Sequence, residues 1–385
     1  KKSSFFLLTI LMHQDGQRAK AILQKLKKGK RMKRLIQKKL KKTKENLYYI
    51  LSALMIGLIV GGIDALFGRV LIAITDFRGR YIQIFIWFLP IAGLFICWMY
   101  HRFNEMSLKG MTLVLETAQG KRADIPLALF PLVMVGTWIT HLFGGSAGRE
   151  GVAVQIGATL SHWFARRFKF ADNRTILLIA GMAAGFGGLF QTPFAAVFFA
   201  MEVVVTGKML YQAFLPSLVA AVTASTFSNA LGLEKFAVPL KQSFNLSESK
   251  TMFYMVILGV VFGLTGRVFS VLLKRAKAFM GEKLANPYKR IGFVSIPLAI
   301  ILFAFFNGRY CGLGTNLISQ TFTGVEIFIF DWIIKLILTV MTLSIGFQGG
   351  EVTPLFSIGA SLGFCLGNLF GISPVLCGAL GYAAV

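Results

Sequence analysis

The sequence predicts an all-α polytopic membrane protein, and three observations carry this prediction. Of the 385 residues, 55% are hydrophobic, and the mean hydropathy of +0.68 is well above that of a soluble globular chain. The apolar residues lie in runs of about 18 or more with few charges, which is the length that spans lipid as a helix. The chain also contains 40 glycines, which suit close packing of helices within a membrane.

Five apolar runs are long enough to cross a bilayer, and each is expected to form membrane helices. They are residues 47–75, 81–100, 176–205, 209–231 and 327–345. The third run is expected to break at Gln191–Pro193, because proline cannot continue a helix hydrogen-bond ladder. Asp331 and Lys335 interrupt the last run, which makes it the weakest of the five.

Positive charge is concentrated at the N-terminus. The chain carries a net charge of +25, and residues 1–46 hold 16 basic and 2 acidic side chains. Basic residues before a first spanning segment mark the cytoplasmic side, so we predict a multi-pass cell-membrane protein with a cytoplasmic N-terminus. An apolar stripe within residues 22–40 favours a helix lying on an anionic leaflet. Nucleic-acid binding is the alternative for this basic run, and we predict no nucleic-acid partner.

The chain divides into two related halves after this basic leader. We predict a first membrane repeat at 47–231, a polar linker at 232–250 and a second repeat at 251–385. The segment Gly148–Leu160 aligns with Gly350–Leu362 at a constant offset of 202 residues, so that IGATL matches IGASL. Chance similarity between glycine-rich apolar segments is the competing explanation. Internal repeats in transporters commonly place the binding site at their interface.

Both copies place a glycine cluster directly before an apolar helix. The first amides of a helix are unpaired and carry partial positive charge, so such a terminus attracts anions. Glycine-rich segments also serve simply as helix contacts, but Glu150 favours a functional site because a carboxylate inside lipid is costly. At a helix N-terminus Glu150 would be held by the amides that bind an anion, and it would leave by taking up a proton.

Three further acids are candidates with weaker support. Glu202 is expected to be a second buried acid, either a proton relay or, preferably, a structural hydrogen-bond acceptor. Glu351 aligns with Arg149 in the repeat and is either a coupling group or a paired charge. Asp64 is expected to cap or pair locally within the first long helix.

Cysteine and histidine show no clustering. The four cysteines and four histidines stand singly, without a CxxC motif or metal-ligand spacing. The sequence also lacks a Walker A motif and an associated nucleophile, base and orienting group. We therefore predict no disulfide, no metal site, no cofactor and no enzymatic activity.

The segments Gly148–Gly151 (GREG) and Gly349–Pro354 (GGEVTP) resemble motifs of the CLC chloride channel and transporter family. The resemblance runs from about Leu47 to the C-terminus. It implies a CLC-like antiparallel (inverted) two-repeat helical bundle that forms homodimers with one pore per subunit, and it assigns the gating, proton-transferring role to Glu150. The final helices of that fold are expected to be missing after Val385, and Tyr382 does not match the family's intracellular gate tyrosine.

Departures from the family pattern resemble its fluoride-exporting branch. Val152 stands for the proline after GREG, Met111 for the chloride-ligating serine, and Val352 for the phenylalanine of the second motif. Val203 occupies the position of the internal acid of chloride/proton exchangers. The resulting anion pathway consists of Gly110, Met111, Gly148, Arg149, Gly151, Val152, Gly350, Glu351, Val352 and Thr353.

These departures predict a secondary transporter that exports fluoride in exchange for protons. Fluoride is small, strongly hydrated and a good hydrogen-bond acceptor, so backbone amides and Thr353 are expected to replace its water. Met111 and Val352 are expected to line a narrow apolar path. The alternatives are a CLC-type chloride channel or chloride/proton exchanger and, more remotely, a non-transporting membrane scaffold.

Overall fold

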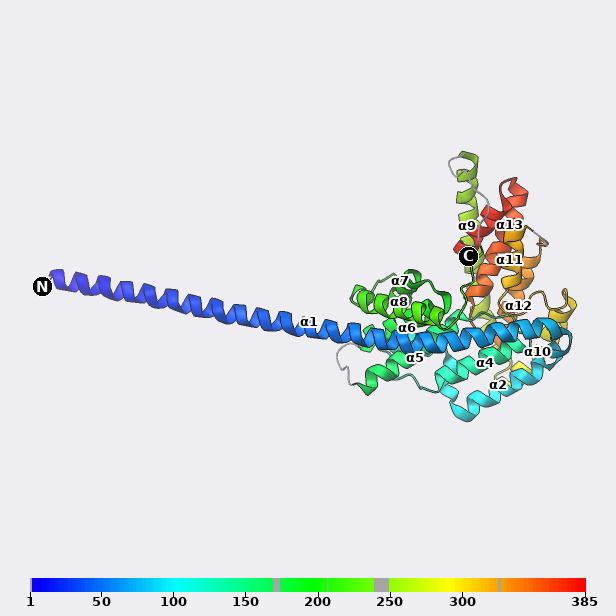
Figure 1. The fold of residues 1–385 in the computed structure, drawn as a ribbon, viewed down its shortest axis with the longest axis horizontal. Coiled ribbons are helices and arrows are strands. Elements are labelled where there is room, and N and C mark those ends of the chain that lie inside the picture. The colour runs from blue at the N-terminus through cyan, green and yellow to red at the C-terminus, as the bar shows by residue number, and fades with distance from the viewer. Residues whose placement is uncertain (1, 169–173, 206, 239–248, 325–326) are drawn as a thin grey trace. The chain divides into compact units, whose positions relative to one another are not determined.

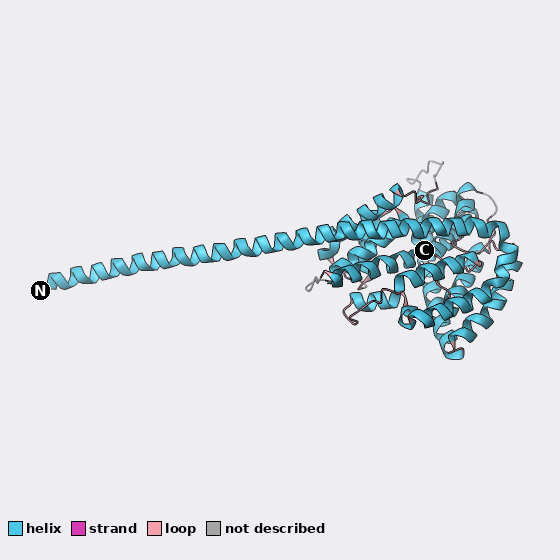
Figure 2. Cartoon of the chain, turned by 60° about the horizontal axis from the view of Figure 1, so that its bottom comes forward, coloured by secondary structure: helices cyan, strands magenta, loops and turns pink. Residues whose placement is uncertain are grey.

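The computed structural model describes residues 2–168, 174–205, 207–238, 249–324 and 327–385, with side chains from residue 44 onward except those of residues 249–251. Among these residues the secondary structure is helical, and no strand is present (Figure 2). The α-helices are α1 (Lys2–Phe85), α2 (Leu89–Phe103), α3 (Met111–Ala118), α4 (Leu129–Leu142), α5 (Glu150–Arg167), α6 (Arg174–Phe190), α7 (Pro193–Val203), α8 (Phe214–Ala230), α9 (Ser249–Lys283), α10 (Pro287–Ala304), α11 (Thr315–Thr323), α12 (Asp331–Ile345), α13 (Val352–Phe370) and α14 (Pro374–Ala384). Short 3-10 helices occupy Ile86–Phe88, Glu105–Lys109 and Tyr211–Ala213.

The chain forms two compact units, Lys1–Ser52 and Ala53–Val385. The described part of the first unit is helical, and the predicted apolar stripe of the leader falls on side chains outside the described set. The second unit holds all the other helices. Most of the predicted linker, residues 239–248, also lies outside the described residues, as do residues 169–173 between α5 and α6. The predicted repeat boundaries stay predictions.

The lengths and surfaces of the helices suit a bilayer. Five described stretches are long and apolar enough to cross it. They are Lys44–Phe103, Tyr211–Ala230, Met252–Lys283, Pro287–Ala304 and Val352–Phe370. Helix α9 exposes Phe253, Val256, Val260 and Leu264 at helical spacing, as expected for a side that contacts lipid.

The break predicted in the third apolar run occurs where expected, whereas in the last run α12 begins at Asp331 and continues through Lys335. Helix α6 ends at Phe190 and α7 begins at Pro193, so the break at Gln191–Pro193 is confirmed. Asp331 is the first residue of α12, where its carboxylate accepts hydrogen bonds from Arg309 Nη2 at 2.7 Å and from the Tyr310 hydroxyl at 2.6 Å. This pairing allows a fully buried acid at the start of a membrane helix.

Equivalent glycines of the two repeats make equivalent close contacts. A Cβ atom built on Gly157 of α5 would overlap the carbonyl oxygen of Gly181 in α6. A Cβ atom on Gly359 of α13, the repeat partner of Gly157, would overlap the carbonyl oxygen of Gly381 in α14. Each repeat thus packs the helix after its glycine cluster against the next helix through glycine, which supports the internal repeat over chance similarity.

Helix α5, which starts at Glu150, contacts α3, α4 and α6 of the first repeat. Helix α6 contacts both α5 and α8, and Figure 1 shows these labels gathered in one region of the second unit. In the second repeat, α13 contacts α9, α11, α12 and α14. Helices α5 and α13 also contact each other, which brings the two glycine-rich segments together.

Asp64 departs from its expected role. Its side chain is fully buried in α1, and neither carboxylate oxygen has a hydrogen-bond partner among the described residues. The expectation of a local cap or pair is therefore wrong, because Asp64 faces α6, where a Cβ atom on Gly188 would overlap its Oδ2.

The glycine contacts generate a stability prediction. Substitution Gly157→Ala should destabilise the fold by about 1–3 kcal/mol, the usual cost of overpacking a core, because the new methyl group meets backbone that cannot move aside. Thermal unfolding of the purified protein in detergent measures this as a lower Tm. The matched control is Gly259→Ala, where the added Cβ meets nothing within 4 Å. Equal Tm values for the two variants would contradict the packing argument.

Candidate anion and proton site

Two glycines join the repeats at the centre of the site. Gly148 N donates to Gly350 O at 2.6 Å, and Gly350 N donates to Gly148 O at 2.8 Å. A Cβ atom on Gly148 would lie 2.6 Å from Glu150 Oε2 and 2.8 Å from Pro354 Cδ. A side chain at this position would therefore disturb the contact between Gly148 and Gly350. The pair fixes the N-termini of α5 and α13 against each other.

Glu150 lies at this junction. Its side chain is the first of α5 and is 1% exposed. Oε2 accepts hydrogen bonds from Arg149 N at 3.0 Å and from Thr353 N, across the repeat interface, at 3.1 Å. Thr353 is the second residue of α13, so its amide is one of the unpaired donors at that helix N-terminus. The carboxylate of Glu150 therefore occupies the anion-attracting end of the opposite helix.

Several polar atoms around Glu150 have no hydrogen-bond partner among the described residues. They are Glu150 Oε1, Arg149 Nε and Nη1, and Thr353 Oγ1. All belong to buried residues, where an unsatisfied polar group costs about 1–3 kcal/mol. The site thus holds donors for a small anion beside a group that can carry a proton. Within the described residues, no group of three or more His, Cys, Asp and Glu side chains is placed to hold a metal ion.

A third helix N-terminus adjoins α5. Helix α3 begins at Met111 and is preceded by Gly110 in a left-handed conformation (φ +50°), which favours glycine. A Cβ atom on Gly110 would lie 3.2 Å from Gln155 Oε1, on α5. Met111 is partly buried and packs against the apolar cluster around Leu113 and Val154. The structure thus places Gly110 and Met111 beside the helix that begins at Glu150.

The remaining candidates differ in their surroundings. Val352 is partly buried at the start of α13, and Gly151 lies against Gly350, whose Cα is 3.7 Å from a Cβ built on Gly151. The side chain of Val152 is fully buried in an apolar cluster with Phe67 and Leu71, so it faces the core.

Two of the candidate acids are exposed. Glu351 is exposed although its repeat partner Arg149 is buried. Glu202, expected to be a buried acid, is exposed on α7 in the single chain, so that expectation of burial is wrong here.

A polar stripe on α12 holds the loop before Glu150, and sequence reasoning did not assign it. Lys335 Nζ donates to Ser146 Oγ at 2.9 Å and to the carbonyl oxygens of Tyr310 and Gly312 at 3.0 and 2.6 Å. Ser146 Oγ is also 2.9 Å from Thr339 Oγ1, and Ser146 N donates to Thr342 Oγ1 at 3.2 Å. The spacing 335, 339, 342 inside an apolar run was the available signal, because it places all three side chains on one helix face.

Tyr382 is a second residue whose position the sequence did not indicate. Its ring lies 4.5 Å from that of Phe356 on α13, the helix whose Thr353 amide meets Glu150. The side chain is carried by α14, which packs on α13 through Gly381. Tyr382 therefore packs on the second helix of the candidate site, and the expectation that it is not the family's gate tyrosine stays a prediction.

Comparisons with known proteins agree with this architecture. Residues 92–385 match the family described as voltage gated chloride channel. The chain is 33% identical over 338 residues to a chloride/fluoride channel protein of Pseudomonas syringae pv. tomato, covering 86% of this chain and 74% of that protein. It is 24% identical over 369 residues to the H(+)/Cl(-) exchange transporter ClcA of Salmonella arizonae, covering 89% and 76%.

Solved structures share the fold. The crystal structure of a CLC-type fluoride/proton antiporter superposes with a TM-score of 0.86 at 47% identity, covering 88% of this chain and 86% of that one. A slow cyanobacterial Cl-/H+ antiporter superposes with a TM-score of 0.76 at 19% identity, covering 87% and 84%, and this likeness concerns the fold alone. The helical arrangement is thus the CLC fold, as the resemblance of the motifs implied. The chain is a multi-pass membrane protein that belongs to the voltage-gated chloride channel (CLC) family of transport proteins.

Proposed function

We propose that this protein exports fluoride in exchange for protons, with Glu150 as the proton-carrying gate. The observation that carries the proposal is the hydrogen bond from Thr353 N to Glu150 Oε2, which puts the carboxylate on the N-terminus of the opposite repeat's helix. Further support comes from the similarity, at 47% identity, to a CLC-type fluoride/proton antiporter.

Exchange follows from competition at this one position. While Glu150 is ionised, its carboxylate takes the amide of Thr353 and excludes another anion. A proton taken up on the carboxylate weakens this hydrogen bond, because a neutral acid is a poorer acceptor. The side chain then swings away and leaves the amide to fluoride. Return of Glu150 as a carboxylate expels fluoride and releases the proton. The two ions move in opposite directions when the proton reaches Glu150 from the side on which fluoride leaves and is released to the side from which fluoride enters.

Selectivity for fluoride rests on donors held in a narrow space. Fluoride loses a large hydration energy on entering. The donors that would replace it are the Thr353 amide and hydroxyl and the Arg149 nitrogens that have no hydrogen-bond partner among the described residues. Met111 and Val352 supply no hydroxyl and keep the path apolar. Chloride is larger and is held less well by closely spaced donors.

A chloride channel or chloride/proton exchanger is the second candidate. It is favoured by the family description and by the similarity to a transporter named for chloride exchange. Against it stand Met111 and Val352 at the positions where the chloride-transporting pattern has serine and phenylalanine. We include a cytoplasmic N-terminus, inferred from the basic leader, and a homodimer in the proposal.

Removal of the proton-carrying group should uncouple the two fluxes. In proteoliposomes, Glu150→Gln should still pass fluoride, while fluoride-driven proton movement falls by about a hundredfold or more, the scale of losing a proton-transferring side chain. A fluoride electrode and an internal pH dye record both fluxes together. The control is Glu282→Gln on the exposed end of α9, which should keep the coupling. Coupling retained by Glu150→Gln would remove Glu150 from its role.

Restoring the chloride-type side chains should reduce the preference for fluoride. We expect Met111→Ser combined with Val352→Phe to lower the fluoride-to-chloride flux ratio by about tenfold, equal to ~1.4 kcal/mol of differential binding. The reason is that a hydroxyl ligand favours chloride while the phenyl ring removes the narrow space. Ion-selective electrodes on matched liposomes measure the ratio. An unchanged ratio would mean that selectivity does not depend on these two positions.

The conformation of the loop before Glu150 should depend on the hydrogen bonds that Lys335 donates. Lys335→Met leaves Ser146 Oγ and two carbonyl oxygens without their buried donor, at about 1–3 kcal/mol for an unsatisfied group. The variant should unfold at lower temperature and transport fluoride more slowly. The matched control is Ile337→Met on the exposed face of the same helix. Wild-type behaviour in both variants would show that the loop is held without Lys335.

A further inference from the structure

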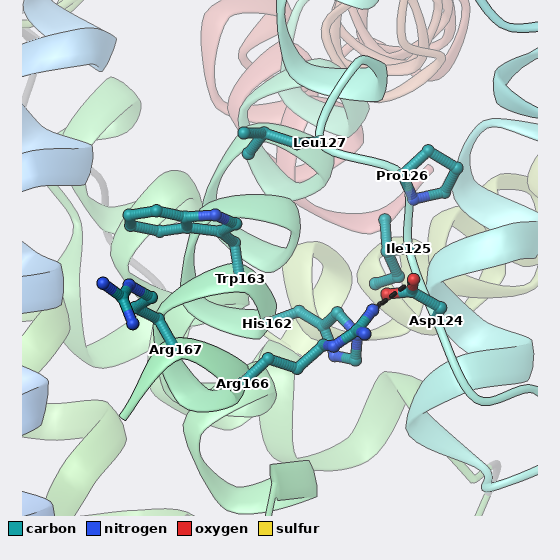
Figure 3. Close-up of a pocket in the computed structure, with 8 residues that line it drawn as sticks. All are labelled: Asp124, Ile125, Pro126, Leu127, His162, Trp163, Arg166 and Arg167. Carbon is teal, nitrogen blue, oxygen red and sulfur yellow. Dashed lines mark hydrogen bonds and ion pairs between the residues drawn. The ribbon is translucent and has the colours of Figure 1, made fainter. Parts of the chain in front are cut away.

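A groove of about 400 Å³ lies where the connection between α3 and α4 meets the end of α5, away from the Glu150 site. Its lining combines charged and apolar side chains (Figure 3). They are Asp124, Ile125, Pro126, Leu127, His162, Trp163, Arg166 and Arg167. Nothing in the proposed transport cycle uses these residues.

The charged part of the groove is held in a defined arrangement. Asp124 pairs with Arg166 and lies 3.0 Å from His162 Nε2, which must donate because a carboxylate only accepts. Burial alone would raise the pKa of the Asp124 carboxyl, but the hydrogen bonds from Arg166 and His162 outweigh it and hold that pKa below its ordinary value. Asp124 therefore stays ionised at neutral pH and keeps Arg166 in place. The Arg166 side chain is still 49% exposed, so it can take a second partner.

The charges leave the groove positive. Two arginines, Arg166 and Arg167, face one carboxylate, and Arg167 is exposed with no ion pair among the described residues. Figure 3 shows Arg167 on the same side of the groove as Trp163, opposite Ile125 and Pro126. Arg166 reaches toward Asp124 whereas Arg167 lies on the Trp163 side, so the two exposed basic side chains flank the groove and are open to an anion.

The apolar part of the groove lies where the connection between α3 and α4 and the end of α5 each change between charged and apolar residues. Along the chain, charged residues at 121–124 give way to Ile125, Pro126 and Leu127, and Leu127 is 41% exposed. On α5, Arg166 and Arg167 lie one turn after Trp163, which is 46% exposed. Two such transitions at one place mark a membrane–water interface, where tryptophan is enriched and arginine reaches toward head groups.

We propose that this groove binds an anionic phospholipid. The phosphate is held by Arg166 and Arg167, and the glycerol and upper acyl chain lie against Trp163 and Leu127. Charge complementarity favours this occupant, because basic pockets between membrane helices recognise anionic head groups. A free phosphate ion would leave the apolar half unused. The basic leader of this chain carries the same sign of charge as the groove and is a poor occupant.

Brominated lipids test the proposal on the full chain, because they quench a nearby tryptophan. The protein is reconstituted in phosphatidylcholine with a small fraction of brominated phosphatidylglycerol or of brominated phosphatidylcholine. The anionic probe should quench more strongly, and Trp163→Phe should remove this excess. Arg166→Gln and Arg167→Gln should each weaken the apparent affinity for the anionic probe about fivefold, the scale of one basic side chain near a membrane surface.

The controls distinguish binding of the anionic lipid in the groove from its general attraction to basic residues elsewhere on the protein. Arg102→Gln removes an exposed arginine at the end of α2, outside the groove, and should leave the excess quenching unchanged. Equal loss in Arg102→Gln and Arg167→Gln would overturn the proposal, as would an excess that survives Trp163→Phe. Displacement of the anionic probe by an equal concentration of inorganic phosphate would reassign the groove to a free anion. Fluoride flux is not the readout, so failure here leaves the proposed function untouched.

Discussion

The structure depends on placing one carboxylate at the meeting point of two helix N-termini inside a membrane. An isolated charge there would be costly. Glu150 Oε2, however, accepts hydrogen bonds from two backbone amides, that of Arg149 in the first repeat and that of Thr353 in the second. Those amides are available because both helices begin at the junction, where Gly148 and Gly350 pair. The same amides that stabilise the carboxylate would stabilise a small anion. The cost of burial and the capacity for exchange thus have one physical origin.

Glycine makes this junction possible at two levels. At the site, Gly148 leaves room for the Glu150 carboxylate and Pro354. Farther along the helices, Gly157 lets α5 pack directly on the backbone of α6, and Gly359 lets α13 pack directly on the backbone of α14. Close backbone packing is a main source of cohesion between helices in lipid, where hydrophobic burial provides little. The helix contacts therefore hold the two N-termini in register.

Support for the site extends beyond the residues that would touch an ion. Ser146 forms hydrogen bonds with three side chains of α12, those of Lys335, Thr339 and Thr342. Lys335 also donates to the carbonyl oxygens of Tyr310 and Gly312. Elements distant in sequence thus meet at the loop that precedes Glu150. Under the proposed exchange cycle such support would keep the surrounding donors fixed while Glu150 changes its partners.

The sequence by itself determined the membrane class and the helix break before Pro193, and it predicted the internal repeat and Glu150 as the central acid of the candidate site. These follow from hydropathy, proline chemistry and motif spacing, which are local properties. Only the tertiary structure decided which side chains meet. It exposed Glu202 and Glu351, and it buried Asp64 without a partner among the described residues. It also turned Val152 toward the core, brought Lys335 to the loop before Glu150 and packed Tyr382 on Phe356 of α13. These outcomes depend on contacts between residues far apart in the chain, and local pattern carries no record of them.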